Sequence, residues 1–152
     1  MTKVMTTTVL ALLALAFGAA SAQGAAYAGK TRDGSSIRLK VVGSRVSAIK
    51  TSVPASCVET TGSFATRAGA ELFQPPGSFA LGRAGRARAL QPAAMNGGIR
   101  ATKSYTVEVR RAGAKLTGTL RVSFSFLRPG VDVYHSYVFV CTGSTRFSLA
   151  AR

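Results

Sequence analysis

The sequence predicts an all-β domain, an antiparallel β-sandwich or small barrel of about seven to nine strands preceded by a cleaved signal peptide. Apolar and polar residues alternate over much of the chain, and turns that contain glycine or proline separate these stretches. No segment sustains the apolar period of an amphipathic helix. A chain of 152 residues suits one small domain and excludes cofactor enzymes of the Rossmann or TIM-barrel type.

Residues 1–22 are predicted to be a secretory signal peptide. One cation, Lys3, precedes an apolar run over residues 9–17, and a small Ala-Ser-Ala motif ends at Ala22. The apolar run is too short to span a bilayer. We therefore expect cleavage after Ala22, a single mature domain over residues 23–152, and a secreted or extracytoplasmic location.

The predicted export helps to interpret the two cysteines of the chain, Cys57 and Cys141. In an exported protein, an even number of cysteines indicates disulfides, and two cysteines allow one pairing. The bond would close a long loop, which in the chain-entropy model stabilises the fold by about 4.5 kcal/mol.

Three strands are expected in the first half, over residues 26–31, 37–42 and 45–53. An Asp-Gly turn separates the first two, and Pro54 is expected to end the third. Cleavage after Ala28, which also ends a small-x-small motif, would remove part of the first strand. The third strand is expected to contain a bulge, because its apolar residues do not keep a strict alternation. Weaker candidate strands cover residues 58–64 and 72–73.

The second half begins with a long hairpin, with one strand over 105–110, a turn at Ala112-Gly113, and a return strand over 116–126. Residues 131–141 are predicted to form a central strand, because the end of this stretch is apolar on both faces. A turn at Thr142-Gly143 is expected to lead to a last strand around residues 147–149.

The apolar pattern fails over residues 74–103, where glycine and proline recur. Within this irregular segment, we expect a solvent-exposed loop that carries Arg83, Arg86 and Arg88. These three arginines are the candidate anion-binding residues.

No catalytic, cofactor-binding or metal-binding site is expected. His135 is the only histidine, and Asp132, three residues earlier, would face the other side of an extended strand. A glycosidase pair from distant segments, such as Glu59 with Glu71, is a disfavoured alternative. The scattered carboxylates match no calcium loop.

The net charge of +15 is the feature with most functional weight, because such a surface attracts polyanions. Anionic cell-envelope polymers are the favoured partner. Nucleic acid is disfavoured because the protein is expected to be exported and lacks an RNA-binding aromatic motif. Solvation and edge protection of strands, or G+C-rich coding, is the favoured explanation of the charge, and a functional anion-binding face is the alternative. A sugar-binding module is less favoured because the chain has no tryptophan.

Several short motifs carry a resemblance: Tyr27-x-Gly29-x-Thr31, Val53-Pro54-x-x-Cys57, Leu116-x-Gly118-Thr119-Leu120 and Cys141-Thr142-Gly143. With them, the chain resembles small, exported, disulfide-containing β-proteins of actinobacteria. The resemblance implies export, a disulfide and a β-fold, and it implies no activity.

The sequence thus favours a secreted, non-catalytic β-domain that binds anionic envelope polymers through an arginine-rich surface. The alternative is a small secreted hydrolase or inhibitor with its site in the irregular 74–103 segment.

Overall fold

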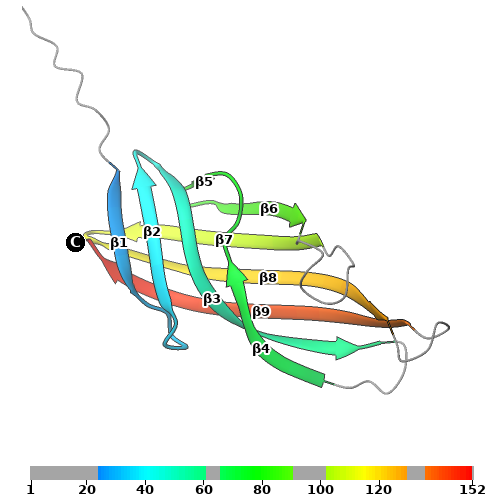
Figure 1. Cartoon of the computed structure of the whole chain (residues 1–152). Coiled ribbons are helices and arrows are strands. Elements are labelled where there is room, and N and C mark those ends of the chain that lie inside the picture. Colours follow the sequence, from blue (N-terminus) through cyan, green and yellow to red (C-terminus); the bar gives the residue numbers. More distant parts are fainter. Residues whose placement is uncertain (1–23, 61–65, 91–101, 130–135, 152) are drawn as a thin grey trace, which may run out of the picture.

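The computed structural model describes residues 24–60, 66–90, 102–129 and 136–151 (Figure 1). These residues form an all-β, antiparallel structure, as the sequence predicts, with nine strands in one sheet. The predicted signal peptide lies outside the described residues. The strands are β1 (Ala25–Lys30), β2 (Ser36–Val42), β3 (Arg45–Glu59), β4 (Thr66–Phe73), β5 (Phe79–Ala80), β6 (Ala84–Leu90), β7 (Thr102–Ala112), β8 (Lys115–Pro129) and β9 (Ser136–Ala150).

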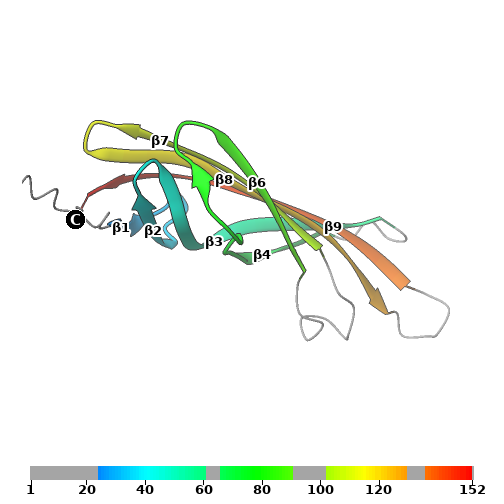
Figure 2. The same cartoon turned by 90° about the horizontal axis from the view of Figure 1, so that it is seen from above.

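The strand order in the sheet is β1-β2-β3-β9-β8-β7-β6, and β4 and β5 pair with β3 outside this path. The sheet is not closed into a barrel. β1 and β2 instead run crosswise to the long strands β7, β8 and β9 (Figures 1 and 2). The sheet therefore curls over itself and encloses the core between its two parts.

β3 belongs to both parts of the sheet because it changes partners along its length. Its first residues pair with β2 as far as Lys50, and its last residues pair with β9 from Ala55 onward. Pro54 lies between these two pairings and does not end the strand, contrary to the sequence prediction. Proline has no N–H to donate, and here it falls where β3 has no ladder with β2 or β9.

The core consists of inward side chains from all parts of the sheet. The alternation of buried and exposed residues along β2, β7 and β9 shows how each strand contributes one face. The largest fully buried apolar side chains include Phe73, Ile37, Leu116 and Leu120. The ring of Phe73 also meets that of Tyr105 edge-on, with centroids 5.1 Å apart, so β4 packs against β7 across the core.

The first hairpin is joined to the last strand by backbone contacts. Isolated bridges pair Tyr27 with Ala151 and Thr31 with Phe147. The predicted Asp-Gly turn adds a side-chain contact, because the hydroxyl of Thr145 donates a hydrogen bond to the carboxylate of Asp33. These contacts hold β1 and β2 over the core.

The predicted bulge is present between β2 and β3. The register shifts between Lys40 and Val41: Lys40 faces Ala48, whereas Val41 faces Val46. Ser47 is thus the extra residue, and both Val46 and Ile49 remain buried.

The long predicted hairpin is confirmed as β7 and β8, with Gly113 in its turn at φ of 59°. The predicted turn at Thr142-Gly143 is wrong, because residues 136–150 form the single strand β9. Gly143 serves a close approach instead. A Cβ atom at this position would clash with the carbonyl oxygen of Pro54 on β3.

The disulfide between Cys57 and Cys141 is present, and these two residues face each other directly in the ladder of β3 and β9. The bond spans 84 residues of sequence and lies next to the point where β3 joins β9. It therefore covalently fixes the pairing that holds the two parts of the sheet together.

We expect Cys57→Ser and Cys141→Ser each to lower the free energy of unfolding by about 2–5 kcal/mol. The double variant should be no less stable than either single variant, because both substitutions remove the same bond. Chemical denaturation of the oxidised protein and the three variants measures this. Additive losses would contradict a single shared interaction.

We expect Gly143→Ala to destabilise the protein, because the new methyl group would push Pro54 and Ala55 away from β9. Overpacking of this kind costs about 1–3 kcal/mol. Gly69→Ala on β4 is the matched control, since a Cβ atom there meets nothing within 4 Å. Thermal unfolding of both variants should show a clear loss only for Gly143→Ala, and equal midpoints would contradict the close approach.

Candidate anion-binding face

Small hydroxyl residues and arginines cover most of the outward side of β6–β9. We call this surface the basic face. The antiparallel register aligns its side chains in rows that cross the strands, because directly paired residues point to the same side of a sheet. Its described members are Arg86, Arg88, Ser104, Thr106, Glu108, Arg110, Thr117, Thr119, Arg121, Ser123, Thr142, Ser144, Arg146 and Ser148.

Two rows lie at the centre of the basic face. The first runs from β3 to β6 through Ser56, Thr142, Ser123, Ser104 and Arg88. At a strand spacing of about 4.8 Å, it spans about 19 Å. The second, one step further along the strands, joins Ser144, Arg121, Thr106 and Arg86. Each row therefore ends in an arginine of β6.

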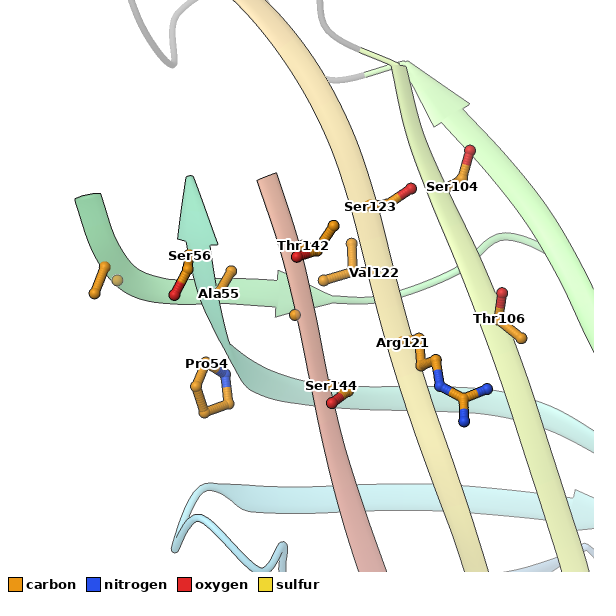
Figure 3. A pocket seen from close by; sticks show the side chains of 13 residues that line it. Pro54, Ala55, Ser56, Ser104, Thr106, Arg121, Val122, Ser123, Thr142 and Ser144 are labelled. Atoms are coloured by element: carbon orange, nitrogen blue, oxygen red, sulfur yellow. The ribbon is translucent and has the colours of Figure 1, made fainter. Parts of the chain in front are cut away.

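The face is hollowed where these rows approach β3, leaving a cavity of about 640 Å³. Figure 3 shows the hydroxyl groups of Ser56, Ser123 and Thr142 together with the guanidinium of Arg121 along this hollow. Gly69 and Gly143 also line it and add no side chain. The hollow thus presents hydroxyl groups and one cation beside apolar side chains such as those of Pro54, Ala55 and Ala68.

Exposed apolar side chains border the hollow on one side. Val58 and Val140 face each other across β3 and β9, one row beyond Ser56 and Thr142, and are 39% and 44% exposed. The polar part of the surface is therefore bounded on this side.

The structure places the three candidate arginines differently from the sequence prediction. Arg86 and Arg88 lie on β6, an edge strand that pairs with β7, and not in a loop. The alternation that forms this strand is easy to overlook, because its inward residues are as small as Ala87 and Ala89, which pack against the core. Arg83 lies in the turn before β6, outside the two rows. The predicted irregular segment thus contains a regular strand.

Sequence reasoning did not single out Arg121 or Arg146. Arg121 lies 3.2 Å from the carboxylate of Glu108, and both side chains are about half exposed. Arg146 lines two smaller hollows of about 440 and 390 Å³, beside Arg110 in the first and beside Lys30 and Arg32 in the second. Glu108 is the one carboxylate in strands β6–β9. The alternation in the predicted hairpin could have located Arg121 on the same face as Thr106.

Beneath the basic face, on the inner side of the sheet, lies a buried ion pair. Lys103 of β7 contacts the carboxylate of Glu71 of β4, and the two residues are 3% and 8% exposed. The ammonium also lies 5.4 Å from the centre of the Phe124 ring. Burial lowers the pKa of Lys103 to about 8, and burial raises the pKa of the neighbouring Tyr105. The pair joins β4 to β7 across the core.

The described residues among the disfavoured catalytic candidates, Glu59 and Glu71, do not form an accessible site. His135 and Asp132 lie outside the described residues. Glu59, like Glu71, lies on the inner side of the sheet and is 2% exposed, and Glu71 is engaged with Lys103. Burial at this level keeps a substrate away from both carboxylates, so the arrangement does not favour a glycosidase pair. Among the described residues, no group of three or more histidine, cysteine or acidic side chains could hold a metal ion.

No family model, curated protein or solved structure matches the chain. The resemblance to exported actinobacterial proteins therefore stays a prediction. Within the described ranges, no helix is long and apolar enough to cross a membrane.

We expect the buried ion pair to give the protein a distinct dependence of stability on pH. The pKa of Lys103 in the folded protein is about 8, below the ordinary value for lysine. Between these two values the unfolded chain binds more protons than the folded chain, so this residue makes stability rise with pH. Urea unfolding at pH 7 and pH 9.5 should show that rise.

The control is the double variant Glu71→Gln, Lys103→Met, which keeps the side-chain sizes and removes both charges. Its stability should lack this contribution, while all other titrating groups contribute equally in both proteins. The same change between the two pH values in parent and variant would show that Lys103 is not desolvated in the folded state.

Proposed function

We propose that this protein is a secreted, non-catalytic β-domain that binds anionic cell-envelope polymers through the basic face. One observation carries the proposal: the rows of hydroxyl groups end at Arg86 and Arg88 on an edge strand, so hydrogen-bond donors and positive charge form one continuous surface. Extended polymers suit such a surface because they can follow a row across several strands.

The excess of arginines over carboxylates on the basic face also supports anion binding. Glu108 is the one carboxylate of β6–β9 and neutralises Arg121 only in part, because both groups are exposed to water. The other arginines of the face are Arg86, Arg88, Arg110 and Arg146. Guanidinium groups bind phosphate and carboxylate groups with two parallel hydrogen bonds, and the hydroxyl groups between them supply neutral donors.

The exported location predicted from residues 1–22 favours a polymer of the cell envelope over nucleic acid as the partner. The face also lacks exposed aromatic side chains in its described part, which single-stranded nucleic acid and sugar platforms generally require. We therefore take the partner to be a polymer recognised by its negative charges.

The test is salt-dependent binding of the protein to heparin resin, as a charged stand-in, and to purified anionic wall polymer. We expect the double variant Arg86→Ser, Arg88→Ser to elute at lower salt, with a salt slope smaller by about one for each arginine that binds an anionic group of the polymer. Its thermal midpoint should stay nearly unchanged, because exposed substitutions cost at most about 0.5 kcal/mol each. Arg83→Ser alone should have a smaller effect, because Arg83 lies outside the rows.

The matched control is the double variant Arg111→Ser, Lys115→Ser, which removes the same charge from exposed positions at the end of the β7–β8 hairpin. It should elute close to the parent protein. Equal elution of the two double variants would mean that only net charge matters and that the basic face is not a site. A parent protein that passes through the resin at physiological salt would reject polyanion binding altogether.

A further inference from the structure

The outward side of β2 and β3 carries a second basic groove, separate from the basic face. It has a volume of about 430 Å³ and is formed where β2 and β4 flank β3. It is lined by Ser35, Ser36, Arg38, Lys50, Thr51, Ser52 and Leu72. The groove therefore combines two cations, several hydroxyl groups and one apolar side chain.

Arg38 and Lys50 are direct partners in the ladder of β2 and β3, so their charged side chains leave the same side of the sheet next to each other. Like charges placed directly opposite destabilise a strand pair. Neighbouring positions show no such conflict: Lys40, one step along the same face of β2, is opposite Ala48 and Ala26. The direct pairing of Arg38 with Lys50 thus places the repulsion at the groove.

None of the described carboxylates lines the groove. The four carboxylates in the described part of the chain all have other surroundings. Asp33 accepts a hydrogen bond from Thr145, Glu71 contacts Lys103, and Glu108 contacts Arg121. Glu59 is buried near the end of β3, nine residues beyond Lys50. Among these residues, the protein itself offers no counterion to the two cations.

We propose that this groove is a binding site for a phosphate monoester. Such a group carries a charge of about −1.5 to −2 near neutral pH and three strong acceptor oxygens. These properties match two adjacent cations, Arg38 and Lys50, with serine hydroxyls around them. Leu72 is 48% exposed at the edge of the groove and offers an apolar contact to the group that carries the phosphate.

This site uses none of the residues of the basic face, so it stands or falls independently of the proposed function. The test is calorimetric titration with glycerol 3-phosphate at constant ionic strength, with glycerol as the uncharged comparison. Arg38→Ser and Lys50→Ser should each weaken binding about tenfold, because each removes a charge-assisted hydrogen bond. The double variant Arg38→Ser, Lys50→Ser should bind no better than the background.

Two controls separate this site from general attraction to a positive protein. Lys40→Ser, on the same face of β2, and the double variant Arg86→Ser, Arg88→Ser should both bind glycerol 3-phosphate like the parent. In addition, removing either Arg38 or Lys50 should raise the thermal midpoint at low salt without ligand, because the repulsion between them is relieved. Equal weakening by Lys40→Ser would overturn the proposal.

The phosphate monoester can be a free small molecule or a lipid headgroup, and a second arm distinguishes these sources. Vesicles of phosphatidylcholine with phosphatidic acid display a monoester, whereas vesicles with phosphatidylglycerol at equal charge display a diester. Binding of glycerol 3-phosphate indicates a soluble ligand, and binding only to phosphatidic acid vesicles that is abolished in the double variant indicates a lipid. If neither probe binds, or if the double variant Arg38→Ser, Lys50→Ser binds both probes like the parent, the groove is not a phosphate monoester site.

Discussion

The change of partners along β3 is the constraint on which the architecture depends. A single strand pairs with β2 in its first part and with β9 in its last part, so the crosswise first hairpin and the long strands belong to one sheet. Pro54 marks the change, Gly143 allows β9 to approach it, and the Cys57–Cys141 bond lies just beyond it. Without the pairing between β3 and β9, the described part of the chain would keep only shorter contacts between the two parts, such as the bridges from Tyr27 and Thr31 to the end of β9. Residues of the same junction, Pro54, Ala55 and Gly143, line the hollow in the basic face. The junction that organises the fold therefore also shapes the candidate site.

Acidic and basic side chains are distributed differently between the inner and outer sides of the sheet. Of the four described carboxylates, two are buried on the inner side of the sheet, and a third is held against Thr145. Acidic groups are therefore used mainly for internal contacts, whereas the described arginine and lysine side chains other than Lys103 occupy outward positions. An outward surface with so few carboxylates has little internal neutralisation, and mobile anions or an anionic partner must supply it. Composition alone could attribute the net charge to solvation. The structure shows in addition which outward positions of the fold carry it.

Much of the fold could be predicted because alternation is strong in the strands that bury large side chains. β2, β7 and β8 place Ile37, Val107 or Leu120 inward with polar residues between them, and the sequence indicates these strands clearly. β6 escapes prediction because alanines form its inward side, so the contrast in hydropathy is weak. The extents of β3 and β9 could not be predicted for another reason: Pro54 and Gly143 ordinarily interrupt strands. Here Pro54 lies where β3 pairs with neither β2 nor β9, and Gly143 allows a close approach to β3 that a side chain would prevent. The register between strands aligns the rows of the basic face and pairs Arg38 with Lys50. A single sequence does not specify this register when loops vary in length.

The bridge between Tyr27 and Ala151 brings the first and last described strands side by side at one end of the molecule (Figure 1). A short linker could therefore join the two ends without crossing the sheet, and the chain could be opened elsewhere to give a circular permutant. It also means that an attachment next to the start of β1 or the end of β9, to a surface or to another domain, would occupy the same end of the molecule.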